Sequence, residues 1–566
     1  MRTGQASWGK ALSLGLIAGG TVVFVSLVGM VEALGVRVIV VGVIDFGRLL
    51  LLLIGFVAGY QVARRDGGTG APVVLLGGLV TGAVTGVGLA ALLLLGSVVN
   101  LRGMFINASP VLFEIISFGR GTAAAPVVVA AGALAGLLGA AATFLPSAVR
   151  GPLGAGLTAA ITVGLFQELL QIILQEGSVR NALREFIFVP EGLPPRGALG
   201  IFLSVSAVSV VWRWRRPAVQ GWVAGRPPQA RRVLRWLLLG LAVALALVMP
   251  LAGGLFISQV LVLVGLYTLM GLGLNLEVGF AGLLDLGFVA FFAIGAYTVA
   301  LLTSTSQYGI AHWSFWAAVP VALVVSLIAG LLFGLPILRI RGDYLAIATL
   351  GFGEIIRLLV LSDALRPWLG GSQGVVSIPK PMIGAFEFSG PTQIYYITLV
   401  ASALIAFVGA RLRDSRLGRA WMAMREDEDV AEAMGINLVN VKLLAYGIGG
   451  AFAGMGGAIF AVLLGSIFPH SFSLLISINV LALIIVGGMA SLPGVVVGSL
   501  FLVGLPELLR EFSDFRFLVY GAALIIMMQV KPEGLWPAAA VRRELHKDEP
   551  VGVVAGQSVA AERTEG

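Results

Sequence analysis

Charged side chains interrupt several apolar stretches of this sequence. Asp285 sits in GLLDLG, Glu354 and Arg357 sit in GFGEIIR, and Glu507 sits in LPELLR. Ionisable groups inside apolar segments are costly, so by default they indicate a role in gating or in lining a transport pathway. Glu354 and Arg357 are three residues apart and can pair on one helix face. The sequence therefore favours structural or gating roles for these charges over direct contact with a substrate.

Two asparagines lie in similar surroundings. Asn275 and Asn479 are polar residues within apolar runs. Amides in such places more often join helices by hydrogen bonds than contact a substrate. We count both among the candidate pathway or gating residues, with helix cross-linking as the plainer interpretation.

Motifs for catalysis and for metal binding are missing from the sequence. It has no cysteine, no H-E-x-x-H and no G-x-S-x-G, and its three histidines, His312, His470 and His546, are far apart. It also has no G-x-x-x-x-G-K-[ST] loop to hold the phosphates of ATP. We expect no enzyme activity, no metal and no cofactor in this chain. Energy for any transport must come from another subunit or from a gradient.

One polar segment stands apart from the apolar remainder. Residues 411–442 read RLRDSRLGRAWMAMREDEDVAEAMGINLVNVK, and the following residues 443–506 contain no Asp, Glu, Lys or Arg. A dense block of charge cannot cross lipid, so it must lie in water. We expect a short amphipathic helix at about 420–434 that ends at Gly435, where glycine permits a left-handed turn. Such a surface suits a partner in the aqueous phase.

The composition places most of the chain in a membrane. Of its 566 residues 58% are hydrophobic and 12% charged, whereas a soluble domain carries about 25% charged residues. We predict an all-α polytopic bundle of roughly sixteen spans, ten of them in a C-terminal core. The predicted spans are 11–31, 38–62, 72–99, 122–148, 151–173, 197–212, 236–250, 256–276, 286–304, 315–338, 344–361, 393–410, 443–467, 474–490, 494–509 and 517–530.

Basic clusters set the expected orientation, because cytoplasmic loops are enriched in Lys and Arg. If the N-terminus is cytoplasmic, alternation over these spans puts nearly every strong basic cluster, and residues 411–442, on the same side. We therefore expect a multi-pass protein of a prokaryotic plasma (inner) membrane with both termini in the cytoplasm. The positive net charge of +8 is explained in this way without a nucleic-acid partner.

The same pattern divides the chain into domains. Residues 213–235 hold seven arginines and three prolines, and we predict a basic cytoplasmic linker there. It would join an N-terminal membrane extension, 1–212, of unknown role to a C-terminal membrane domain, 236–537. The polar tail 538–566 is predicted to be disordered and cytoplasmic.

Several longer strings occur in a specific order. They are LNLEVGFAGLLDLGFVAFFAIGAY from 274, RIRGDYLAIATLGFGEIIRLLV from 339, LGRAWMAMREDEDVAEAMGIN from 417 and VGGMASLPGVVVGSLFLVGLPELLREF from 486. In order and spacing they resemble the permease subunits of ABC importers for branched-chain amino acids. The resemblance covers about 235–537, and the N-terminal extension is longer than this family leads us to expect.

The resemblance implies specific partners. A second related permease would complete the pathway, two ABC ATPase subunits would dock on the cytoplasmic face, and an external binding protein would deliver a hydrophobic amino acid. Glu432, Ala433 and Gly435 resemble the family's coupling loop, which sits in a cleft of the ATPase. Arg425 and Asp427 belong to the same candidate coupling surface.

Other functions remain open on the sequence alone. The same architecture could carry urea or short amides. A gradient-driven transporter or channel would need no ATPase, but it would also have no need of the docking segment 411–442. An intramembrane enzyme is the third alternative, and the missing motifs weigh against it.

Overall fold

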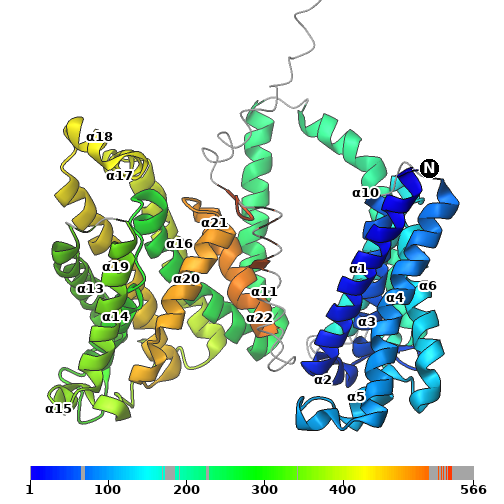
Figure 1. Ribbon diagram of the computed structural model, residues 1–566. Coiled ribbons are helices and arrows are strands. Elements are labelled where there is room, and N and C mark those ends of the chain that lie inside the picture. Colours follow the sequence, from blue (N-terminus) through cyan, green and yellow to red (C-terminus); the bar gives the residue numbers. More distant parts are fainter. Residues whose placement is uncertain are drawn as a thin grey trace, which may run out of the picture. The chain divides into compact units, whose positions relative to one another are not determined.

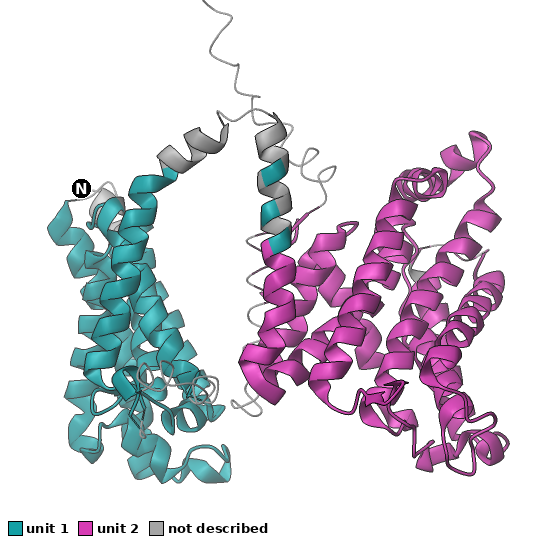
Figure 2. Cartoon of the chain, turned by 180° about the vertical axis from the view of Figure 1, so that it is seen from behind, with its two compact units in different colours: residues 1–240 teal, residues 241–566 magenta. Residues whose placement is uncertain are grey.

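The computed structural model forms two compact units, residues 1–240 and 241–566 (Figures 1 and 2). The structure describes residues 2–65, 70–167, 170–171, 185–189, 192–224, 228–338, 340, 342–508 and single positions or short pieces between 521 and 537. Twelve helices of this described part are long and apolar enough to cross a membrane. The chain is therefore a helical, multi-pass membrane protein.

The first unit is built from helices and one short hairpin. Strands β1 and β2 pair antiparallel, with Val38 opposite Asp45. The described elements are α1 (Arg2–Leu27), α2 (Met30–Gly35), β1 (Val38–Val40), β2 (Ile44–Asp45), α3 (Phe46–Arg65), α4 (Ala71–Val98), η1 (Leu101–Gly103), α5 (Pro110–Ile116), η2 (Gly121–Ala124), α6 (Ala125–Ala141), α7 (Ser147–Leu165) and α10 (Pro195–Ala224).

Small residues let two helices of the first unit approach closely. Helices α4 and α6 pack along one another, and a Cβ atom added to Gly132 would lie 3.0 Å from the Cα atom of Gly86. Only glycine fits at that distance. Small residues at a helix contact are the usual means by which membrane helices pack closely.

The second unit contains the remaining elements. They are α11 (Pro228–Leu274, which begins in the first unit), η3 (Asn275–Phe280), α12 (Val289–Thr303), α13 (Phe315–Ile337), α14 (Asp343–Leu361), α15 (Arg366–Leu369), η4 (Gly371–Gln373), β3 (Met382–Ile383), β4 (Phe386–Glu387), α16 (Pro391–Arg413), α17 (Arg416–Glu426), α18 (Glu428–Ala433), α19 (Leu438–Leu464), η5 (Pro469–Ser471), α20 (Leu474–Gly487), α21 (Leu492–Ser499), η6 (Leu500–Gly504) and α22 (Leu505–Leu508). Strands β3 and β4 form an antiparallel hairpin. The elements η3 and η6 are π-helical turns.

Helix α19 forms the core of the second unit. It is the most buried of the candidate spans and packs against α12 and α13. Figure 1 shows α17 and α18 at one end of this unit and α15 at the other. The charged segment and the loop that follows α14 therefore lie at opposite ends.

Helix α11 joins two runs that the sequence predicts as separate spans. The chain continues from 236–250 into 256–276 through Gly254, whose φ of 71° and ψ of −168° are not helical. Pro250 cannot continue the hydrogen-bond ladder of the helix. The Ser258 hydroxyl donates to the carbonyl oxygens of Gly254, at 2.9 Å, and Pro250, at 3.2 Å. These bonds satisfy groups that the break releases, as a membrane requires.

The number of candidate spans differs from the predicted sixteen for three reasons. Helix α12, with 15 residues, and the run 492–508 are shorter than the other spans. The runs 236–250 and 256–276 share α11. The predicted span 517–530 lies largely outside the described residues. A count of sixteen therefore stays a prediction.

The predicted linker is more helical than expected. Helix α10 runs through Pro217 to Ala224, and α11 begins at Pro228. A proline at the first position of a helix costs no hydrogen bond, which explains how α11 begins there. Residues 225–227 and the predicted tail 538–566 lie outside the described residues.

Candidate functional site

The charged segment folds as two short helices rather than one. Helix α17 ends at Glu426 and α18 begins at Glu428, with Asp427 between them in an extended conformation. The Asp427 carboxylate accepts the Val430 N–H at 3.0 Å and so caps α18. The prediction of a continuous helix over 420–434 was wrong, because an aspartate side chain competes for backbone N–H groups and favours a new helix start.

The turn predicted at the end of this segment is confirmed. Gly435 follows α18 with a φ of 87°, in the left-handed region. A Cβ atom added there would meet nothing within 4 Å. Glycine is therefore favoured at this position by its backbone conformation and not by a lack of space for a side chain.

Three contacts fix α17 and α18 to other elements of the unit. The Trp421 ring is fully buried and donates from Nε1 to the Val441 carbonyl oxygen at 2.8 Å. Lys442, which is 5% exposed, pairs with Glu428. Arg425 donates from Nη1 to the Gly279 carbonyl oxygen at 2.6 Å. The two short helices are therefore held to α19 and to η3.

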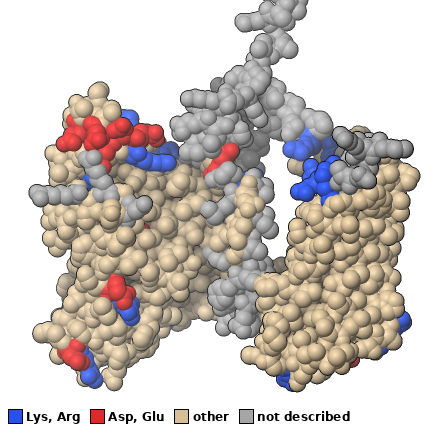
Figure 3. Space-filling view, in the orientation of Figure 1, with Lys and Arg blue, Asp and Glu red and all other residues tan. Residues whose placement is uncertain are grey.

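The outer face of the segment is charged and partly apolar. Figure 3 shows acidic and basic side chains gathered at the end of the unit that carries α17 and α18. Asp427, Glu432, Ala433 and Gly435 are exposed there, whereas Arg425 is half-buried and turned inward. Met434 is 79% exposed beside them.

The electrostatics of this face depend on local pairs. The Arg413 guanidinium hydrogen bonds to the neighbouring Asp414 carboxylate at 2.9 Å and holds the pKa of that carboxyl below its ordinary value. Asp414 is exposed, so solvent screens this ion pair and the pair contributes little to the stability of the fold.

A second group of polar residues is fully buried around η3. Asn275, Glu277 and Asp285 are each at most 1% exposed. Asn275 Oδ1 accepts the Ala490 N–H at 2.9 Å, and an Asp285 carboxylate oxygen accepts the Gly287 N–H at 2.6 Å. The Glu277 and Asp285 side chains interact with one another. Neither Glu277 oxygen, however, has a partner in good hydrogen-bonding geometry among the described residues.

Glu277 is a candidate that the sequence analysis missed. It lies one residue beyond the predicted span 256–276, so the span prediction does not include it. The signal was present, because Glu277 is the single charge between Arg235 and Asp285. In the structure it belongs to a π-helical turn, and such turns are frequent at functional sites.

The predicted pair on α14 is confirmed. Arg357 Nε lies 3.0 Å from both carboxylate oxygens of Glu354, and its Nη2 also pairs with Glu354. Both side chains remain partly exposed, 28% for Arg357 and 42% for Glu354. The pairing explains how both charges are tolerated in a span, but it leaves both heads accessible.

The last two predicted residues lie on α20 and α22. Asn479 is half-buried and hydrogen bonds to the Tyr267 side chain of α11, as expected of an amide that joins helices. Glu507 is half-buried in α22. The candidates therefore form three groups, which are the candidate coupling residues, the buried group at η3 and the pair on α14, while Asn479 and Glu507 lie apart from them on α20 and α22.

Comparison with known proteins relates this arrangement to a transport family. The family described as "Branched-chain amino acid transport system / permease component" matches residues 256–528, within the second unit. The permease protein LivM of Salmonella typhimurium is 40% identical over 310 residues, which cover 51% of this chain and 71% of that protein.

Two further relatives have related names. LivM of Escherichia coli is 40% identical over 48% of this chain and 68% of that protein. The permease protein LivH of Salmonella typhimurium is 26% identical over 48% of this chain and 90% of that protein. All three are named as permease proteins of a high-affinity branched-chain amino acid transport system. No solved structure matches the chain.

Proposed function

Because this chain belongs to the family of branched-chain amino acid transport permeases, we propose that it is the membrane-spanning subunit of an ATP-driven importer for branched-chain or other hydrophobic amino acids. The observation that carries this proposal is the 40% identity to LivM over 310 residues. The exposed, anchored segment 411–442 gives independent support, because a gradient-driven channel has no need of such a docking surface.

The coupling residues are proposed to contact an ATPase. Asp427, Glu432, Ala433 and Gly435 present the exposed surface, and Arg425 anchors it from behind. Two ATPase subunits would dock at this face, and an external binding protein would supply the amino acid at the opposite one. The likeness to LivH as well as LivM supports a second permease of related fold as the membrane partner.

The pathway residues are proposed to act in two places. Asn275, Asp285, Asn479 and Glu507 support gating by joining helices of the second unit, and Glu277 joins this group. Glu354 and Arg357 are proposed to face the pathway, because their heads stay partly exposed. The first unit is an extension of unknown role outside the family match.

The orientation is part of the same proposal. The chain would cross the inner membrane of a prokaryote about sixteen times, with both termini and residues 411–442 in the cytoplasm. The alternation of basic clusters supports this arrangement.

Uptake by cells tests the proposal. Cells that depend on this chain should import leucine, and ATPase subunits should co-purify with the tagged wild-type chain. Glu432→Ala should remain in the membrane at the normal level and lose uptake, since the docking surface is damaged. Arg416→Gln, an exposed change on α17, is the control. Glu432→Ala with normal uptake and normal ATPase co-purification would contradict the coupling assignment.

A further inference from the structure

The two buried carboxyl groups at η3 have the same sign of charge and no counter-ion. Glu277 is 0% and Asp285 1% exposed, and their side chains lie within hydrogen-bonding reach of one another. In the described part of the chain, no Lys or Arg forms an ion pair with either group. Two ionised carboxylates in contact with one another and removed from water are strongly unfavourable.

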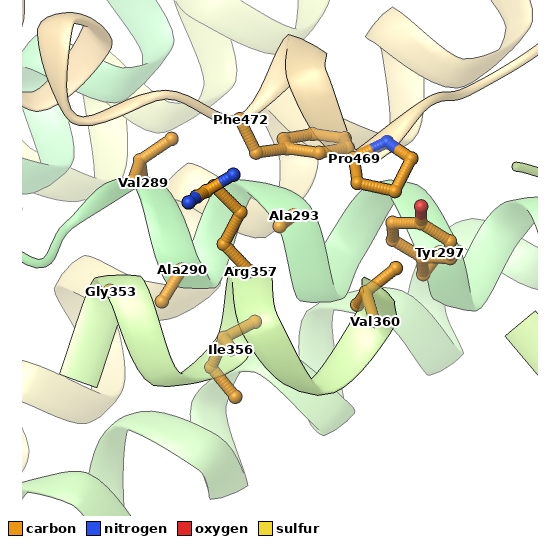
Figure 4. A pocket seen from close by; sticks show the side chains of 10 residues that line it. All are labelled: Val289, Ala290, Ala293, Tyr297, Gly353, Ile356, Arg357, Val360, Pro469 and Phe472. Atoms are coloured by element: carbon orange, nitrogen blue, oxygen red, sulfur yellow. The ribbon is translucent and has the colours of Figure 1, made fainter. Parts of the chain in front are cut away.

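A second charged pair, Glu354 and Arg357 on α14, differs in kind. Its charges have opposite signs, and both side chains are partly exposed. Figure 4 shows Arg357 reaching from α14 toward Phe472. The pocket that these residues line has a volume of about 10 Å³, roughly the least that holds one water molecule. That pair neutralises itself, so neither a ligand nor a proton is needed to account for it.

Polar atoms around the buried pair lack hydrogen-bond partners. Both Glu277 oxygens, Asn275 Nδ2 and the Tyr446 hydroxyl have none among the residues that the structure describes. Tyr446, on α19, is 1% exposed and interacts electrostatically with both carboxyl groups. Gly449, one turn further along α19, lies directly against Glu277, because a side chain there would overlap the Glu277 carboxyl. The backbone of α19 therefore closes this side of the pair.

The two carboxyl groups are not equally provided with donors. An Asp285 oxygen accepts the Gly287 N–H at 2.6 Å. Glu277 faces no described N–H or O–H in good geometry, and what lies within its reach is the other carboxyl group. Two carboxylates are acceptors only, so neither can donate to the other. A single proton would supply the donor that this pair lacks.

We propose that Glu277 and Asp285 form a proton-binding site, in which Glu277 holds one buried proton and donates it to the Asp285 carboxylate. The proton removes one of the two like charges and replaces their repulsion by a short, charge-assisted hydrogen bond. Carboxyl pairs that share one site commonly hold a proton in this way. The proposal goes beyond the import function and does not depend on it.

The site lies next to the contact between α17 and η3. Arg425 of α17 donates to the Gly279 carbonyl oxygen, two residues from Glu277, and so is bonded to the backbone rather than to either carboxyl. The Leu283 N–H donates to the Glu277 carbonyl oxygen at 2.8 Å. Arg425 from α17 and Tyr446 from α19 are the titratable side chains that these two helices bring to the site. The shared proton therefore joins η3 to the loop that carries Asp285.

Infrared spectroscopy of the purified full-length chain tests the proton directly, because a protonated carboxyl and a carboxylate absorb at different frequencies. Spectra at neutral pH are compared for the wild type, Glu277→Gln and Glu354→Gln. Glu277→Gln should lose the carbonyl band of a protonated carboxyl, and its amide should still donate to Asp285. Glu354→Gln should keep that band, since Arg357 holds the Glu354 carboxyl ionised. If Glu277→Gln does not accumulate, Asp285→Asn takes its place, because its amide supplies the missing donor and the same band should be lost.

Thermal unfolding at a series of pH values counts the same proton. Above about pH 5 both carboxyl groups of the unfolded chain are ionised. The folded chain then holds one proton more than the unfolded chain, so its stability should fall as the pH rises, until the folded pair itself loses the proton. At a fixed temperature, the ratio of unfolded to folded protein should rise by up to about tenfold more per pH unit in the wild type than in Glu277→Gln. Glu354→Gln should keep the wild-type dependence.

Three results would overturn the site. The first is a protonated-carboxyl band that neither Glu277→Gln nor Asp285→Asn removes. The second is an equal dependence of unfolding on pH in the wild type and in Glu277→Gln. The third is a wild-type melting temperature that is higher in sodium chloride than in potassium chloride at the same ionic strength, an effect absent from Glu277→Gln, which would place a metal cation rather than a proton between the two carboxyl groups.

Discussion

Glu277 and Asp285 place two carboxyl groups side by side in the core of the second unit, with almost no exposed surface. Buried like charges repel strongly, and a buried carboxylate needs hydrogen bonds to persist. Asp285 has the Gly287 N–H, whereas neither Glu277 oxygen has a well-placed partner among the described residues. The polar group at η3 is therefore only partly satisfied, as is common at functional positions rather than in inert cores.

Asn275 gives a stability prediction for that group. Asn275→Ala removes the acceptor of the Ala490 N–H. The change should lower the free energy of unfolding by about 1–2 kcal/mol, because the partly buried Ala490 N–H loses its acceptor. Asn440→Ala, at an exposed position on α19, should change it by less than about 0.5 kcal/mol. Thermal denaturation of both purified variants checks this, and equal effects would contradict it.

At the scale of elements, α17 and α18 are packed against the rest of the second unit and do not form a loose loop. The Trp421, Glu428 and Arg425 contacts hold α17 and α18 against α19 and η3. From these contacts we expect movement of α17 to be transmitted to the buried turn at η3. Gly282, at a φ of 74°, also packs closely against Arg425, since a Cβ atom there would lie 3.0 Å from Arg425 Cγ.

The turn after α18 gives an element-scale prediction. Gly435→Val should cost about 1–2 kcal/mol, because a side chain is strained at positive φ. It should reduce uptake at a normal membrane level by distorting the docking surface. Gly240→Val, at a helical position with equally open space, is the matched control. If uptake and ATPase co-purification survive Gly435→Val, the assignment of this turn to the docking surface is wrong.

The link from α17 to η3 gives a second prediction at this scale. Arg425→Gln should leave the ATPase bound, because Arg425 is turned inward, while uptake per ATP hydrolysed falls several-fold. Arg416→Gln on the same helix should leave that ratio unchanged. Parallel assays of ATP hydrolysis and uptake on the purified complex measure it. Loss of ATPase binding in Arg425→Gln would instead place this residue at the docking surface.

At the scale of the whole molecule, the arrangement of the second unit predicts its topology. Helices α17 and α15 lie at opposite ends (Figure 1). A reporter fused at Asp427 should report the cytoplasm, and one fused at Ser372 should report the outside. A cytoplasmic signal at Ser372 would mean that the chain crosses the membrane an even number of times between Ser372 and Asp427, and the predicted topology would then be wrong.

Much of this molecule follows from its sequence because lipid imposes simple rules. Apolar runs must become helices, so most spans could be predicted, and the i,i+3 spacing of Glu354 and Arg357 was enough to predict their pairing. The break at Asp427, the continuous α11 and the burial of Glu277 depend on caps and tertiary contacts that a local pattern does not contain. The pocket beside Arg357 combines α12, α14 and η5, which are distant in sequence.

The most direct test of the central claim is leucine uptake by proteoliposomes that contain the purified complex, with leucine-loaded binding protein on the outer side. If the chain is the permease of an ATP-driven importer, leucine should accumulate against its gradient when ATP is present at the side bearing residues 411–442. It should not accumulate with a non-hydrolysable ATP analogue. Equal uptake with and without ATP, ceasing at equilibrium, would contradict the account and indicate a gradient-driven carrier or channel.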